Sequence, residues 1–168
     1  LCTCGLENTG PSCVDDTDRI LPLHGRIGMT PASNVCVRQF WQDDDYKVEL
    51  EGQMRECRIE GHNLLLSRKI SLSAWSDTVW IEDVLENEGN SQFDFMLLYH
   101  INFGYPFIDE GTHVSLNSAG NILGRTEYAK ARVASCHTID PVVDGVEEEV
   151  FFHDIYPGND GLSRVQVE

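Results

Sequence analysis

A histidine at the end of an apolar run is the first residue of this sequence that suggests chemistry. The run reads "FDFMLLYHINF", residues 93–103. Side chains alternate between two faces of a strand, so His100 and Asn102 share a face with the apolar Met96. That face turns from apolar to polar, which is typical of a strand that leaves a core and enters a wet cleft. The pattern alone leaves two readings of His100: a packed histidine that bonds a backbone carbonyl, or a side chain that faces a ligand.

A second histidine lies in a glycine-rich turn, "LPLHGRIGMTP", residues 21–31. Gly25 and Gly28 allow tight backbone geometry and the close approach of a ligand. Arg26 follows the His24–Gly25 pair, and a guanidinium there can donate to sugar hydroxyls or to a carboxylate. The alternative is an ordinary surface turn.

The elements that must position these histidines are mostly strands. Turn-forming stretches such as "ENTGPS", "QDDDY", "ENEGN" and "YPGNDG" recur along the chain. Between them we predict strands at residues 47–60, 64–75, 78–85 and 93–103, the first of them broken near Gly52. Only residues 126–135 favour a helix. Many short strands separated by turns predict an all-β sandwich or barrel.

Composition narrows the class of protein. The chain has 168 residues and a net charge of -16, and such a surface repels nucleic acids and anionic membranes. No apolar run reaches the roughly 20 residues that span a bilayer, and no signal peptide is visible, so we expect a cytoplasmic protein. Because the sequence opens at Leu1 in a strand-like stretch, we expect residues 1–168 to be one β-sandwich domain truncated at both ends.

The six cysteines show no C-x-x-C pair. Structural zinc usually requires four ligands in recognisable pairs, so the spacing favours reduced, buried thiols and no metal site.

Three stretches together carry a family resemblance. "PLHGRIGMTPASNV", "NLLLSRKISLSAWSDTVWIEDVLENEGN" and "FMLLYHINFGYPF" resemble, in order and spacing, the aldose 1-epimerases, which are galactose mutarotase-like proteins. More closely, they resemble an aldose-epimerase-related branch known mainly as uncharacterised bacterial proteins. The resemblance implies an antiparallel β-sandwich, the supersandwich, of which this chain is a central fragment with a sugar cleft on one sheet.

The resemblance also implies a reaction and its residues. The histidine that matches His100 is the family's general acid, which protonates the ring oxygen of an aldose, and the one that matches His24 binds the sugar. A glutamate removes the proton of the anomeric hydroxyl, the ring opens, and closure on the other face gives the other anomer. An ordinary imidazole has a pKa of about 6.5, which suits such a proton donor. The implied partner is a small aldose, and no metal or organic cofactor is required.

The chain departs from the family pattern in three places. Tyr99 stands where better-known enzymes have Asn, Arg26 follows the His–Gly pair instead of preceding it, and no segment before Glu168 matches the family's basic glutamate. We therefore expect the fragment by itself to be inactive or nearly so. The possible substitutes for the base are Glu51, Glu56, Asp109 and Glu110. The residues that we expect to bind substrate are Arg26, Glu51, Arg55, Asn102 and His153.

Two other functions stay open. One is a sugar-binding module or sensor that does not turn over its ligand. The other is a metal-dependent sugar enzyme of the cupin type with His24, His100 and a carboxylate as ligands, although no two histidines lie two to four residues apart. The sequence leaves open which sugar binds and which oligomer forms.

Overall fold

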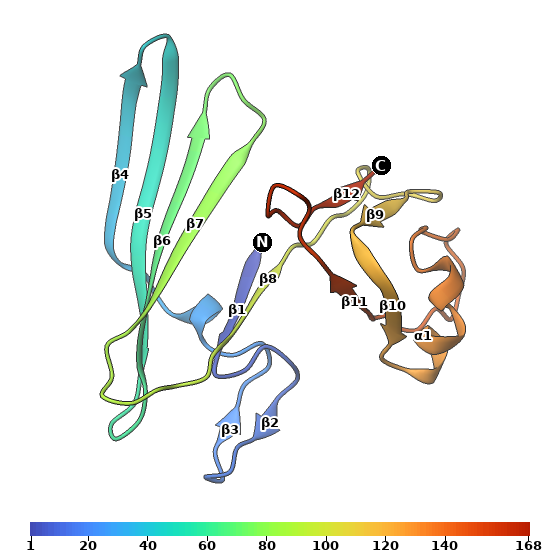
Figure 1. Ribbon diagram of the computed structural model, residues 1–168, viewed down its shortest axis with the longest axis horizontal. Helices are drawn as coiled ribbons and strands as arrows, with labels where there is room; N and C mark the ends of the chain where they lie inside the picture. Colours follow the sequence, from blue (N-terminus) through green and yellow to red (C-terminus); the bar gives the residue numbers. More distant parts are fainter. The chain divides into compact units, whose positions relative to one another are not determined.

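The computed structural model describes residues 1–168, and the chain divides into two compact units, Leu1–Ile101 and Asn102–Glu168. The strands of both units pair antiparallel, as Figure 1 shows for each unit by itself. The predicted all-β, antiparallel class is confirmed.

A four-stranded meander dominates the first unit, with the strand order β4-β5-β6-β7. Its strands are β4 (Ser33–Gln42), β5 (Asp45–Cys57), β6 (Asn63–Ser73) and β7 (Val79–Asn87). The break that we predicted near Gly52 is wrong, because β5 runs through this glycine and pairs it with Arg68. The missing side chain leaves room for Ala32, whose Cβ lies 3.4 Å from the place of a Cβ on Gly52.

The two faces of this sheet differ in polarity. Residues opposite each other in antiparallel strands share a face, so Met54, Leu66 and Leu85 lie together on one side. On that side Leu64 and Leu66 join Leu6 and Ile27 to form the buried core. The other face carries Glu49, Glu51 and Lys69, whereas the charged residues on the Leu66 face include the Arg68–Asp83 ion pair.

A short ladder beside this sheet holds the end of the apolar run. Strand β1 (Cys2–Leu6) pairs antiparallel with β8 (Met96–His100), and Cys2 lies opposite His100. Strand β8 is shorter than predicted, because β1 offers it only five paired residues. A hairpin of β2 (Cys13–Val14) and β3 (Ile20–Leu21), and the 3-10 turn η1 (Ile27–Met29), complete the unit.

The second unit contains two small antiparallel pairs, β10–β11 and β9–β12. Their bounds are β9 (Val114–Leu116), β10 (Ser118–Gly124), β11 (Phe151–Ile155) and β12 (Val165–Val167). The helical prediction is confirmed by α1 (Glu127–Ala131) and the 3-10 turn η2 (Val133–Ser135). The hydroxyl of Thr126 caps α1 by accepting from the Ala129 N–H. No helix of the chain is long and apolar enough to cross a membrane.

The six cysteines are unpaired. The prediction of buried thiols holds for Cys4 and is wrong for the four exposed ones, Cys2, Cys13, Cys36 and Cys57. Edge positions explain two of these, since β4 is an outer strand of its sheet and β2 belongs to a two-stranded hairpin.

Candidate functional site

The His24 turn is held tightly against β1 and the loop that follows it. His24 and Gly25 both have left-handed backbone conformations, with φ of 63° and 75°. The His24 carbonyl accepts from the Gly5 N–H at 3.0 Å, and the Arg26 N–H donates to the Gly5 carbonyl at 2.8 Å. A Cβ on Gly25 would lie 2.1 Å from the Gly5 oxygen and 2.3 Å from the Asn8 oxygen. Only glycine therefore fits here, and the atoms that approach it closely belong to the protein's own backbone.

One nitrogen of the half-buried His24 ring is fixed by the backbone. Nδ1 lies 3.1 Å from the Thr9 carbonyl oxygen, which can only accept a hydrogen bond. Nδ1 must therefore carry a proton, and this assignment leaves Nε2 free to contact a ligand.

His100 lies beside His24. It is the last residue of β8 and is half-buried. The two ring centroids are 5.5 Å apart with an interplanar angle of 61°, an edge-on arrangement. Two residues that are far apart in the sequence thus meet, because β1 binds the His24 turn through its backbone and β8 through its ladder.

A pocket of about 500 Å³, within the size range of small-molecule sites, opens at the His24 turn, and His100 is not among the residues that line it. His24 and the exposed Arg26 line it, together with Thr3, Leu23 and Met29. Arg26 has no ion-pair partner, so its guanidinium is available to a ligand in the pocket. No carboxylate lines this pocket.

Tyr99, which departs from the family pattern, is bound elsewhere. Its hydroxyl donates to an Asp83 oxygen at 2.6 Å, and Arg68 makes two hydrogen bonds to the same carboxylate at 2.7 and 2.6 Å. Burial raises the pKa of Tyr99, and the bond to Asp83 adds to this. Burial alone would raise the pKa of Asp83, but the bonds from Arg68 and Tyr99 hold it below its ordinary value. Neighbouring side chains on a strand point in opposite directions. Tyr99 therefore points toward the four-stranded sheet, where it bonds Asp83, and His100 points away from it.

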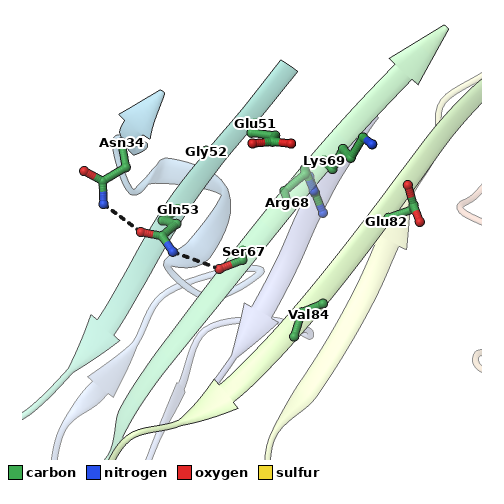
Figure 2. Close-up of a pocket in the computed structure, with 9 residues that line it drawn as sticks. All are labelled: Asn34, Glu51, Gly52, Gln53, Ser67, Arg68, Lys69, Glu82 and Val84. Carbon is green, nitrogen blue, oxygen red and sulfur yellow. Dashed lines mark hydrogen bonds between the residues drawn. The ribbon is translucent and has the colours of Figure 1, made fainter. Parts of the chain in front are cut away.

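The structure does not bring Glu51 and Arg55 to the His24 pocket. Both side chains project from the polar face of β5, on the opposite side from Gly52 and Met54. Glu51 pairs with Arg38 at 2.5 Å, and Arg55 bonds Glu88 and Asn63. Glu51 instead lines a polar pocket of about 490 Å³ together with Gln53, Ser67, Lys69 and Glu82 (Figure 2).

Asn102 and His153 belong to the second unit. Asn102 is exposed, just after the end of β8. His153 lies on β11, with its ring centroid 5.4 Å from that of His137, which is 6.0 Å from His113. Burial lowers the pKa of His153, and the nearby His137 lowers it further.

Among the possible substitutes for the base, Glu56 is buried and does not line the His24 pocket. Asp109 and Glu110 are exposed and belong to the second unit.

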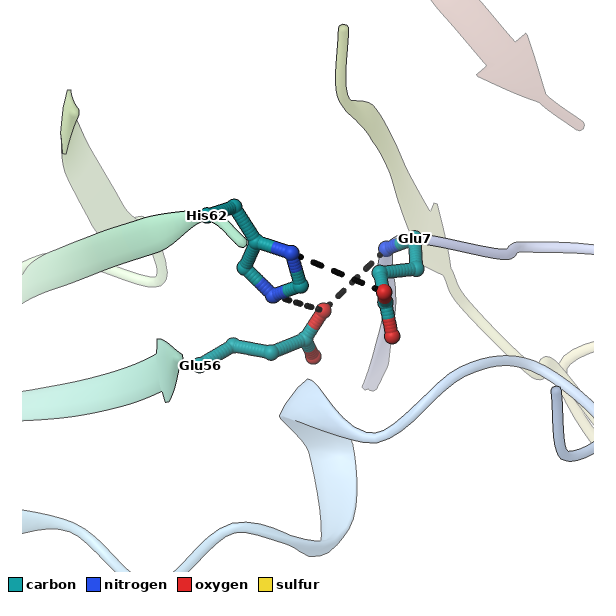
Figure 3. A group of neighbouring side chains, drawn as sticks. All are labelled: Glu7, Glu56 and His62. Atoms are coloured by element: carbon teal, nitrogen blue, oxygen red, sulfur yellow. Dashed lines mark hydrogen bonds and ion pairs between the residues drawn. The ribbon is translucent and has the colours of Figure 1, made fainter. Parts of the chain in front are cut away.

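Sequence reasoning missed one cluster, formed by Glu7, Glu56 and His62 (Figure 3). His62 had no assigned role, because its "EGHN" context is that of a surface turn. It is nevertheless 4% exposed, and the cluster is the one group of side chains in residues 1–168 that could hold a metal ion. The cupin-type alternative has no such support, since His24 and His100 are not in that group.

Comparisons with known proteins show which family the chain belongs to. A family model described as "Domain of unknown function (DUF4432)" matches residues 1–168, and the chain belongs to this family. A search of curated proteins found no match.

A solved structure is similar over nearly the whole chain. It is the crystal structure of a protein from Klebsiella pneumoniae subsp. pneumoniae that carries a provisional assignment as an aldose 1-epimerase. The TM-score is 0.91 at 27% sequence identity, over 98% of this chain and 42% of the other. The resemblance to the aldose 1-epimerase superfamily and its antiparallel β-sandwich class is confirmed. The chain spans less than half the length of that protein.

Proposed function

We propose that this chain carries the proton-donating side of an aldose 1-epimerase active site. The observation that carries the proposal is the edge-on contact of His100 with His24, which lines a pocket together with Arg26. The similar Klebsiella structure supports the substrate class, a small aldose.

Each residue has a role in this mechanism. His100 donates a proton to the ring oxygen as the bond from C1 to that oxygen breaks, while a base takes the proton of the anomeric hydroxyl. Rotation about C1–C2 and the reverse proton transfers give the other anomer, so His100 ends in its starting state. His24, with Nδ1 donating to Thr9, offers Nε2 as an acceptor for a sugar hydroxyl, and Arg26 donates to a sugar oxygen.

The base is not among the residues that line the His24 pocket. We propose that a carboxylate from another part of the full-length protein supplies it. The missing base also favours a second candidate, a sugar-binding module without turnover.

Anomer exchange by the full-length protein tests both. Polarimetry or NMR exchange across a panel of aldoses should show acceleration over buffer, and His100→Ala should lower the rate about 10²- to 10⁴-fold. A matched control is His113→Ala, an exposed histidine of the second unit, which should leave the rate unchanged. Sugar binding by calorimetry without exchange would support the binding module instead, and an unchanged rate in His100→Ala would refute the mechanism.

A further inference from the structure

The cluster of Glu7, Glu56 and His62 lies in the first unit and shares no residue with the His24 pocket. Glu7 follows β1, Glu56 is near the end of β5, and His62 precedes β6. Their side chains are 7%, 5% and 0% exposed. Figure 3 shows the imidazole between the two carboxylates.

The His62 ring is buried without a hydrogen bond. Neither ring nitrogen has a partner: Nδ1 lies 3.6 Å from a Glu7 oxygen and Nε2 lies 3.8 Å from a Glu56 oxygen. Such distances are too long for hydrogen bonds, and a buried polar atom without a hydrogen bond destabilises the folded state. Packing on Phe93, with ring centroids 4.4 Å apart, holds the ring in this place. The imidazole is therefore aimed at the carboxylates without bonding them.

The Glu56 carboxylate also lacks an Arg or Lys partner. It accepts only from the backbone N–H groups of Leu6 at 3.5 Å and Glu7 at 3.2 Å. Glu7, in contrast, pairs with Arg19 at 2.8 Å and with Arg58 at 3.6 Å. The ionisable group that faces Glu56 is His62, at 3.8 Å, and a cation bound between them would compensate the buried carboxylate charge.

We propose that Glu7, Glu56 and His62 form a buried site for a divalent transition-metal cation of the zinc class. One atom from each side chain lies within 4.8 Å of the others. Zinc bonds of about 2.0–2.2 Å to oxygen and nitrogen require the ligands to close in by roughly 1 Å. Imidazole with carboxylates favours such a metal over Ca²⁺, which takes oxygen ligands only.

A cation uses one imidazole nitrogen, and the other nitrogen then carries a proton. The bound ion would join the segment after β1 to the β5–β6 hairpin. Since β1 also holds the His24 turn and β8, the metal would stabilise the frame of the His24–His100 pair without taking part in its chemistry.

Metal content and Zn²⁺ titration of the full-length protein test the site. After chelator treatment, Zn²⁺ alone should bind with one ion per chain by elemental analysis and raise the melting temperature by several degrees. His62→Ala and Glu56→Gln should each lose this ion and the thermal shift. The controls His113→Ala and Glu82→Gln, which change exposed residues outside the cluster, should keep both.

A second measurement holds even if a variant fails to fold. In ¹⁵N NMR of the wild-type protein, Zn²⁺ should convert His62 to a form with one metal-bound and one protonated nitrogen. The proposal is overturned if the wild type takes up no zinc, if His62→Ala and Glu56→Gln bind it unchanged, or if the ¹⁵N signals of His62 do not change when Zn²⁺ is added. None of these results depends on epimerase activity.

Discussion

The first unit contains two histidine sites that differ in burial. His24 and His100 are half-buried beside a pocket, and one nitrogen of His24 is already bound by a carbonyl. His62 is closed off between Glu7 and Glu56, with both nitrogens unmet. A half-buried histidine such as His24 can contact a substrate. The buried His62 cannot, because its side chain is closed to solvent, so it can contribute only to the structure or to binding an ion.

Both sites depend on β1. Gly5 bonds the His24 turn, Cys2 lies opposite His100, and Glu7 follows the same strand into the closed cluster. A substitution in β1 should therefore disturb both sites. A substitution in the His24 pocket or in the His62 cluster should disturb only that site.

The largest expected effect comes from Gly25→Ala. The new Cβ would overlap the Gly5 and Asn8 carbonyl oxygens in a left-handed conformation, so we expect the free energy of unfolding to fall by more than about 2 kcal/mol. Urea unfolding measures this, and anomer exchange should fall with it. Gly10→Ala is the control: its Cβ would meet only the Asn8 side chain, at 3.8 Å, so its stability should change by less than about 1 kcal/mol. Wild-type stability in Gly25→Ala would show that the turn is not held as described.

Chemical modification tests the contrast in burial directly. Diethyl pyrocarbonate must touch an imidazole nitrogen, so His24 and His100 should react at least about tenfold faster than His62, which reacts only after local opening. Peptide mass spectrometry against time gives the three rates. In urea the three residues should react alike. Equal rates in the folded protein would mean that the His62 cluster is open to solvent.

The smallest effect should come from Arg26→Ala. Loss of a charged donor from the pocket should raise KM for the aldose by about 10- to 100-fold, since a hydrogen bond to a charged group contributes about 1.5–3 kcal/mol. Steady-state anomer exchange measures KM and kcat separately. Arg125→Ala, which removes an ion pair with Glu148 in the second unit, is the control and should leave KM unchanged. A lower kcat at constant KM in Arg26→Ala would indicate a role in the reaction instead of binding.

Much of the fold was predictable because its signals are local. Alternation and turn residues predicted β6, β7 and the His24 turn. A helix was predicted over residues 126–135, where α1 lies. The limits of β8 were not predictable, because they depend on the length of its partner β1. The unbroken β5 was missed because a neighbouring residue, Ala32, occupies the space beside Gly52.

The site was predictable only in part. His24 and His100 were named from their motifs, and their roles stay predictions. Glu51 and Arg55 were chosen for residue type, but strand alternation turns them to the polar face, away from the His24 pocket. His62 was passed over because a turn histidine looks exposed from the sequence.

The sequence by itself determined that the chain is made of antiparallel strands and that a His–Gly turn and a strand-ending histidine occur in the order of the aldose 1-epimerases. It also determined that no segment before Glu168 matches the basic glutamate of that family. Only the tertiary structure decided which histidines meet and which are closed off. The physical reason is that backbone periodicity acts over a few residues, whereas the 5.5 Å approach of His24 to His100 and the burial of His62 depend on pairings between distant segments.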